Sequence, residues 1–292
     1  MLRTLVKPVL RASFGGGAAR QVSPHALRGF KTTAVTQYKA PLREMDFLLN
    51  DVLDVESHFK KMKATGGEYV DKDTVLQILE SHASFCEETL GPLNEVGDQV
   101  GCKWVDEHTV KTPPGYKEAY DIYREGGWQG LSNAEEWGGQ GLPYSLSLFS
   151  SDMAATANFT WTMYPGLSKG CINTMISHAS DELKQKYLPN LVSGQWTGTM
   201  CLTEPQCGSD LGQVNTKAVP VGDGKYKLTG TKIFISCGEH DMTDNIIHCV
   251  LARLPDAPSG TRGISLFLVP KRLVDQAGEV GELNGCKIGR IE

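Results

Sequence analysis

The chain has 292 residues and a formal net charge of −5, with 40% hydrophobic and 22% charged residues. This composition is typical of one large or two ordinary globular domains with a sizeable core. No basic stripe interleaved with aromatic residues and no uninterrupted run of 18 apolar residues occurs in the sequence, which argues against nucleic-acid binding and predicts no membrane span.

The N-terminal end differs in charge from the rest. The first 43 residues contain no Asp or Glu, whereas eight of them are basic, and apolar residues alternate with the basic ones at helical spacing between Leu2 and Leu10. An acid-free, Arg-containing leader is typical of a mitochondrial transit peptide, and a disordered basic tail is the alternative. We therefore expect residues 1–30 to be a transit peptide and the mature protein to reach the mitochondrial matrix.

A helical region follows the leader. Apolar residues recur at helical spacing in Leu42, Met45, Leu49 and Val52. This pattern predicts that residues 31–55 form an N-terminal extension helix. Further helical patterns continue to Gly194, separated by turn signals such as Pro113-Pro114-Gly115. Residues 56–194 are therefore predicted to form a helical domain.

From Gln195 the pattern changes to short β-rich runs. These runs are 197–202, 215–221, 225–228, 232–236, 246–252 and 263–269, and Gly222-Asp223-Gly224 reads as a hairpin turn between two of them. These runs predict that residues 195–292 form an antiparallel β domain. The fold class is α+β, with the helical domain first.

Two runs within the β domain carry the strongest functional signal. In the first, Met200 to Asp210 (MCLTEPQCGSD), an apolar strand ends in Thr-Glu-Pro and turns through Gly-Ser-Asp. The Thr203 hydroxyl and the free backbone N–H groups would bond a flat, polar-edged cofactor, and Gly208 and Ser209 would contact a neighbouring ligand. A purely structural corner capped by Ser209 or Asp210 is the alternative.

The second run, Gly230 to Ser236 (GTKIFIS), follows about 20 residues later. If it forms a strand, Phe234 lies against a cofactor face and Ser236, two residues on, points to the same side. A core position for Phe234 is the alternative.

Both runs, in this order, resemble the flavin-binding signatures of the acyl-CoA dehydrogenase family. The resemblance extends to 131–142 (LSNAEEWGGQGL) and 178–196 (HASDELKQKYLPNLVSGQW), and thus runs from about residue 40 to the end. The segment 38–54 (YKAPLREMDFLLNDVLD) further looks like the N-terminal extension of a larger subfamily that includes 3-(methylthio)propanoyl-CoA dehydrogenases. The family fold implies an antiparallel, barrel-like middle domain after the helical one.

The resemblance implies an FAD enzyme that oxidises an acyl-CoA to the trans-2-enoyl-CoA and passes electrons to electron-transfer flavoprotein. Carried over by position, the flavin contacts are Met200, Leu202, Thr203, Gly208, Ser209, Phe234, Ile235 and Ser236. Ser209 is also expected to touch the substrate. The family's catalytic glutamate lies in a C-terminal helical domain, so we expect no catalytic base within this chain, and a homo-oligomer at full length.

Two alternatives remain open. One is a peroxisomal-type acyl-CoA oxidase, in which oxygen reoxidises the reduced flavin; the acid-free leader argues against it. The other is a non-catalytic, truncated flavin- or CoA-binding module, which fits a chain without the base.

Other chemistries find little support in the sequence. The eight cysteines form no Cys-x-x-Cys pair and the seven histidines no metal-type motif, so no metal site is predicted. Glu135, Glu136 and Glu204 are expected to be solvated side chains or turn formers, and His240-Asp241 a surface turn.

Overall fold

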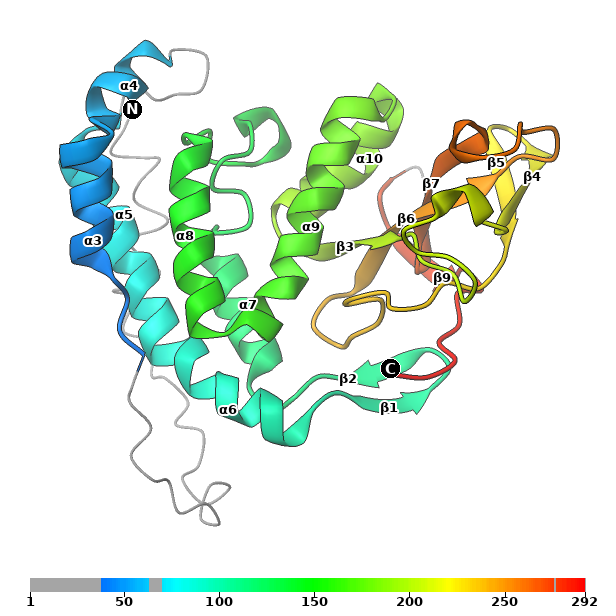
Figure 1. The fold of residues 1–292 in the computed structure, drawn as a ribbon, viewed down its shortest axis with the longest axis horizontal. Helices are drawn as coiled ribbons and strands as arrows, with labels where there is room; N and C mark the ends of the chain where they lie inside the picture. The colour runs from blue at the N-terminus through cyan, green and yellow to red at the C-terminus, as the bar shows by residue number, and fades with distance from the viewer. Residues whose placement is uncertain (1–37, 63–69, 276, 292) are drawn as a thin grey trace.

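The computed structural model describes residues 38–62, 70–275 and 277–291. Helices occupy the N-terminal half and a sheet the C-terminal half, joined by a strand that leaves the helices for the sheet (Figure 1). The predicted transit peptide, residues 1–30, lies outside the described residues.

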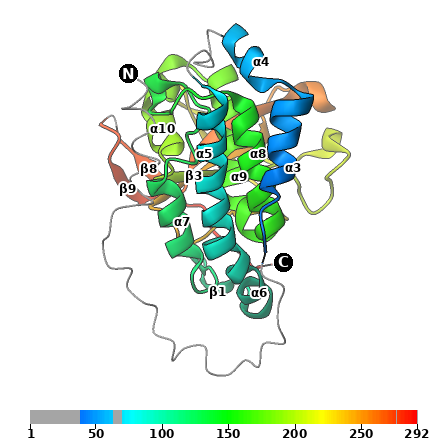
Figure 2. The ribbon, with the colours of Figure 1, turned by 90° about the vertical axis from the view of Figure 1, so that its left-hand side faces the viewer.

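The helices of the first half lie side by side (Figure 2). They are α3 (Leu42–Asp46), η2 (Phe47–Val52), α4 (Val55–Lys61), α5 (Lys72–Phe85), η5 (Cys86–Leu90), α6 (Gly91–Val100), α7 (Tyr116–Glu125), η6 (Glu135–Trp137), α8 (Tyr144–Ala157), α9 (Phe159–His178) and α10 (Asp181–Val192). Side-chain caps fix where α5 and α9 begin. Asp71 accepts from Thr74 N at α5 and Asn158 accepts from Trp161 N at α9, which satisfies amides that have no partner inside the helix. None of the helices among the described residues is long and apolar enough to cross a membrane.

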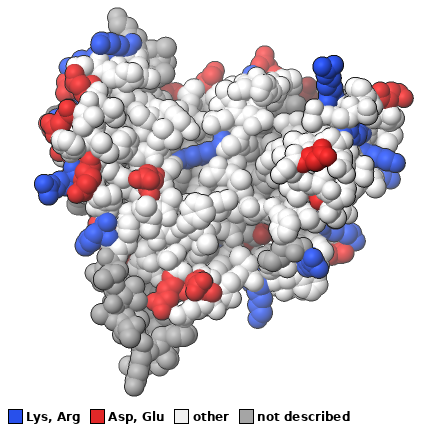
Figure 3. Space-filling view, viewed as in Figure 1, with Lys and Arg blue, Asp and Glu red and all other residues white. Residues whose placement is uncertain are grey.

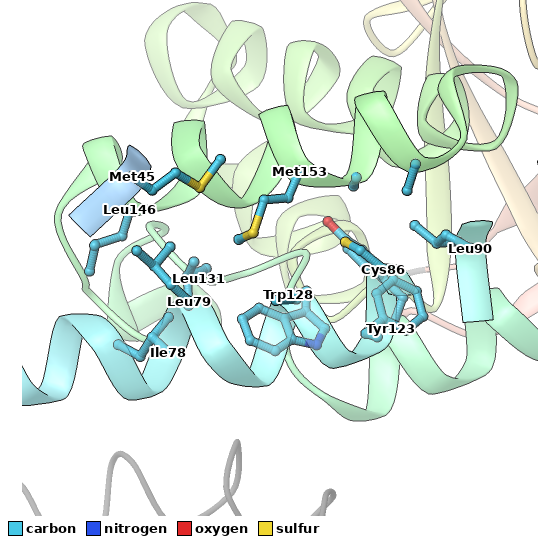
Figure 4. Packing of buried hydrophobic residues seen from close by; sticks show 14 of the residues in the cluster. Met45, Ile78, Leu79, Cys86, Leu90, Tyr123, Trp128, Leu131, Leu146 and Met153 are labelled. Carbon is cyan, nitrogen blue, oxygen red and sulfur yellow. The ribbon is translucent and has the colours of Figure 1, made fainter. Parts of the chain in front are cut away.

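A first core fills the space between these helices. Ile78 and Leu79 on α5 and Met153 on α8 point toward one another, with Trp128 between the two helices (Figure 4). Trp161, at 0% exposure, closes the core from α9. The apolar face of each helix is thus covered, as the helical spacing predicts.

The sheet is mixed, which corrects the antiparallel prediction. Its strands are β3 (Trp196–Cys201), β4 (Lys217–Gly222), β5 (Lys225–Thr229), β6 (Asn245–Arg253) and β7 (Ile264–Pro270); η7 (Leu211–Gln213) and η8 (Thr261–Gly263) lie in its loops. The order is β3-β6-β4-β5, with β7 also paired to β6. β3 runs parallel to β6, with Trp196 opposite Asn245, because the chain returns through the β4–β5 hairpin before it forms β6.

The helical and sheet parts of the predicted α+β fold are confirmed, but the barrel is not. The described strands form one five-stranded sheet, the ribbon of β8 (Arg272–Val274) and β9 (Val280–Leu283), and the hairpin of β1 (Lys103–Asp106) and β2 (Thr109–Lys111). The β1–β2 hairpin reaches from the helices to the chain's last described segment, where Ile288 N donates to Glu107 O at 2.8 Å.

α9 connects the two halves. Its N-terminal part packs into the helical core, while Cys171, Ile172 and Met175 belong to a second core shared with α10 and the sheet. β3 approaches α9 closely at Gly198, whose amide donates to Ser168 Oγ at 3.0 Å. A Cβ on Gly198 would lie 2.4 Å from the Cys171 Cβ, so this approach requires glycine.

Candidate functional site

The two sequence runs meet in space at the end of β3. The chain leaves β3 at Cys201 and turns sharply, with Glu204 and Cys207 exchanging backbone hydrogen bonds of 2.8 and 3.0 Å. Ile233 N then donates to Thr203 O at 2.9 Å, which ties the second run to the first. Segments about 30 residues apart in sequence therefore form one site.

A buried ion pair holds the two runs together. Lys232 Nζ lies 2.7 Å from Glu204 Oε1 and donates to Leu202 O at 3.0 Å. The Glu204 carboxylate also accepts from Thr216 N, Thr216 Oγ1 and Asn215 N, at 3.0, 2.5 and 2.7 Å. Burial raises the pKa of Glu204, but these hydrogen bonds outweigh burial and lower the pKa to about 2.

These contacts correct the expectation that Glu204 is a surface carboxylate, because Glu204 is only 3% exposed. It is neither a solvated carboxylate nor a simple turn former. Its oxygens are occupied by donors that fix the loop, so it is not a free base. Glu135 and Glu136 are exposed, as expected.

The second run is not a strand, which corrects the reasoning that placed Phe234 and Ser236 on one strand face. Residues 230–235 have no regular secondary structure, and Phe234 has a left-handed φ of 54°. Phe234 is also 67% exposed, so it is not a core residue. A bulky residue that is both strained and exposed is a recurring feature of binding sites.

The site combines apolar surface with hydroxyls that lack protein partners. Met200 is 38% exposed, and together with Phe234 it offers apolar contact area. Among the described residues, the hydroxyls of Thr203, Ser209 and Ser236 receive no hydrogen-bond partner. These are groups that a ligand with a polar edge would satisfy.

Glycine at position 208 keeps the space beside Thr203 open. A Cβ there would make van der Waals contact with the Thr203 side chain at 3.4 Å. Leu202, Gly208 and Ile235 are partly exposed, so each reaches the surface of the site. The residues present therefore suit a flat conjugated group with a polar edge.

Two buried histidines form hydrogen bonds to side chains on one face of β3. Thr197 and Thr199 point to the same face, and their hydroxyls lie 2.9 Å from His240 Nε2 and 2.7 Å from His248 Nδ1. Burial lowers the pKa of His240 to about 3 and that of His248 to about 4, so both rings are neutral near pH 7. His240 is 1% exposed, which corrects its assignment to a surface turn.

Sequence reasoning missed Lys232 and both histidines as parts of the site. The Thr197-x-Thr199 alternation just before the first run was the available signal for the polar face of β3. The opposite face of β3 carries Gly198 and Met200, and Gly198 contacts α9. The described residues hold no cluster of His, Cys, Asp and Glu suited to a metal ion.

The chain matches two family profiles that cover most of its length. Residues 73–195 match the N-terminal domain and residues 199–290 the middle domain of acyl-CoA dehydrogenases. The chain belongs to the acyl-CoA dehydrogenase family. The resemblance inferred from the motifs is confirmed, and the site described above lies in the middle domain.

The similar proteins are longer than this chain. It is 42% identical to 3-methylmercaptopropionyl-CoA dehydrogenase of Ruegeria pomeroyi over 85% of its own length but 42% of that protein's. Butyryl-CoA dehydrogenase of Megasphaera elsdenii superposes with a TM-score of 0.56 at 26% identity, over 67% of this chain and 48% of that one. A chain in a structure titled as the electron-transferring flavoprotein of Acidaminococcus fermentans also gives a TM-score of 0.56, at 25% identity, over 73% of this chain and 56% of that one.

Proposed function

We propose that this chain forms the flavin-binding part of an FAD-dependent acyl-CoA dehydrogenase that converts an acyl-CoA to its trans-2-enoyl-CoA. The observation that carries the proposal is the meeting of the two runs, which carry the exposed Phe234 and Met200 and three hydroxyls without a hydrogen-bond partner among the described residues. Bound there, FAD would supply the acceptor for a hydride from the substrate.

The chain's own residues have defined tasks in this proposal. Thr203 and Ser236 would donate hydrogen bonds to the polar edge of the flavin, and Phe234 and Met200 would cover its apolar surface. Ser209, at the outer end of the first run, would contact the thioester-bearing arm of the substrate. Lys232 and Glu204 keep both runs at a fixed separation through their buried ion pair.

The electron acceptor and the group that removes the α-proton are proposed from the family to which the chain belongs. Electron-transfer flavoprotein is the proposed electron acceptor, and the α-proton is removed by a carboxylate that we assign to no residue of this chain. The acyl group we propose is short, with a 3-(methylthio)propanoyl thioester as the first substrate to test, because of the likeness to the Ruegeria pomeroyi protein. The acid-free leader supports a proposed mitochondrial matrix location.

A flavin titration of the purified full chain tests the proposal. FAD binding is followed by its absorbance and fluorescence for the unaltered chain and for the Phe234→Ala, Ser236→Ala double variant. Trp104→Ala removes another exposed aromatic side chain, 46% exposed, from β1 and serves as the control. We expect the double variant alone to lose affinity; a folded chain without FAD binding contradicts the proposal.

A further inference from the structure

Two cysteine side chains meet where α9 packs on the sheet. Cys171 lies on α9 and Cys249 on β6, and their Sγ atoms are 3.5 Å apart. Both residues belong to the second core, with exposed fractions of 4% and 2%. Both are free thiols, so a reduced dithiol pair joins the helical half of the chain to the sheet.

The close approach of β3 to α9 confines the Cys171 thiol. A Cβ on Gly198 would lie 2.7 Å from the Cys171 Sγ atom, so a larger residue at this position would push the thiol away. On its other side, Cys171 Sγ lies 3.9 Å from the carbonyl oxygen of Ile247, two residues before Cys249 on β6. The thiol is therefore held between β3 and β6, next to Cys249.

The contact makes the two thiols chemically unequal. Hydrogen bonding to Cys171 lowers the pKa of Cys249, whereas the same bond, together with burial, raises the pKa of Cys171. The thiolate is the reactive form of cysteine, so Cys249 is the better nucleophile of the two. Met200, its register partner on β3, is 38% exposed, so Cys249 lies one strand away from a side chain that solvent reaches.

The pair is also close to the geometry of a disulfide. The sulfur atoms, 3.5 Å apart, must approach by about 1.5 Å to reach the sulfur–sulfur bond length of about 2 Å. Among the described residues, no second pair of cysteines shares a hydrogen bond. Oxidation of this chain to an internal disulfide should therefore favour Cys171 and Cys249.

We propose that Cys171 and Cys249 form a redox modification site, at which hydrogen peroxide converts the two thiols to a disulfide that fastens α9 to β6. The Cys249 sulfur attacks one peroxide oxygen, the O–O bond breaks, and a sulfenic acid and one water form. The Cys171 sulfur then displaces the sulfenic oxygen as a second water and forms the S–S bond. In total, the two thiols lose two electrons and two protons, and the peroxide takes them up. The proposal does not depend on FAD or acyl-CoA binding.

A disulfide at this place would change the stability of the unit. Cys171 and Cys249 are 78 residues apart in the sequence, and the segment between them contains α10 and the strands β3, β4 and β5. Closing so long a loop restricts the unfolded chain and leaves the folded one nearly unchanged. The oxidised chain should therefore unfold at a higher urea concentration than the reduced chain.

Peptide mapping of the full chain tests the proposal. The chain is treated with an equimolar amount of hydrogen peroxide, the remaining thiols are alkylated, and the unreduced protein is digested with trypsin. Trypsin leaves Cys171 in peptide 170–184 and Cys249, together with Cys237, in peptide 233–253. We expect these two peptides to be joined by a bond that dithiothreitol breaks, and the chain to lose two of its eight thiols.

Matched variants assign the bond to its cysteines. Cys249→Ala should abolish the joined peptides, whereas Cys237→Ala, which removes the other cysteine of the same peptide, should retain them. Cys86→Ala removes a buried cysteine of the helical core and should also retain them. Fragment spectra of the joined peptides from the unaltered chain locate the bond directly, so the result does not rest on the folding of a variant.

Three outcomes would overturn the proposal. They are the absence of joined peptides in the unaltered chain, a bond that fragment spectra place at Cys237, and a urea midpoint that does not rise when the bond forms. The flavin titration uses neither peroxide nor these two cysteines, so failure of the proposed function is distinguishable from failure here.

Discussion

The buried Lys232–Glu204 pair should be essential for the stability of the site. Replacing Lys232 by Met removes the ammonium and leaves a carboxylate that is 3% exposed without its counter-charge. Breaking a buried pair in this way costs about 3–5 kcal/mol. We expect Lys232→Met and Glu204→Gln each to lower the free energy of unfolding by about that amount, since both leave a buried charge behind.

Urea denaturation followed by circular dichroism measures these changes. The Lys232→Met, Glu204→Gln double variant should lose less than the sum of the single losses, because it removes both charges together. Lys60→Met is the matched control: Lys60 lies 2.6 Å from Glu56, but its side chain is 62% exposed. We expect no measurable loss from that variant.

The pH dependence supplies an independent check. The pKa of Glu204 is lowered from 4.5 to about 2, so its stabilising contribution is complete above pH 4.5 and disappears as the pH falls through about 2. The stability difference between the unaltered chain and Glu204→Gln should shrink over that interval. Additive single losses, or losses as small as that of Lys60→Met, would refute the assigned role of the pair.

Three further predictions concern single features of the chain. Thr203→Val should weaken FAD binding about tenfold in a flavin titration, because it removes one hydroxyl donor but keeps the side chain's shape. Gly198→Ala should lower the free energy of unfolding by about 1–3 kcal/mol in urea, because its Cβ would meet Cys171 at 2.4 Å; an unchanged stability would show that α9 can move away from β3. Residues 1–30 fused to a fluorescent reporter should direct it to mitochondria, and a peroxisomal or cytosolic signal would contradict the proposed location.

Local patterns predicted much of the fold and part of the site. The hydrophobic spacing indicated the helices, and Gly222-Asp223-Gly224 indicated the β4–β5 hairpin, because both depend on residues that are near neighbours in sequence. The parallel pairing of β3 with β6 was missed because no turn joins these strands and about 50 residues separate their register partners. A hairpin signal reports only local antiparallel pairing.

The details of the site depended on contacts that sequence spacing does not encode. The left-handed φ of Phe234 is unexpected for a residue with a bulky side chain, and it made the period-2 reasoning for Ser236 wrong. Glu204 looked like a surface carboxylate because its partners Thr216 and Lys232 follow 12 and 28 residues later. The motifs thus pointed to two runs that meet in space, but they did not reveal what holds these runs in place.

α9 connects the sheet that carries the candidate site with the helical half of the chain. One turn of this helix places Ser168 against β3 and Lys169 against α8, so adjacent residues contact the sheet and the helical half. The face of the molecule drawn in Figure 3 carries few charged side chains near its middle, between the helices and the sheet. Lys169 is half-buried between α8 and α9 and donates to two serines, so water screens its charge less than that of a fully exposed lysine. Because Ser168 is fixed to β3 through Gly198 N while Lys169 is fixed to α8, a displacement of α9 would disturb the sheet and the helical half together.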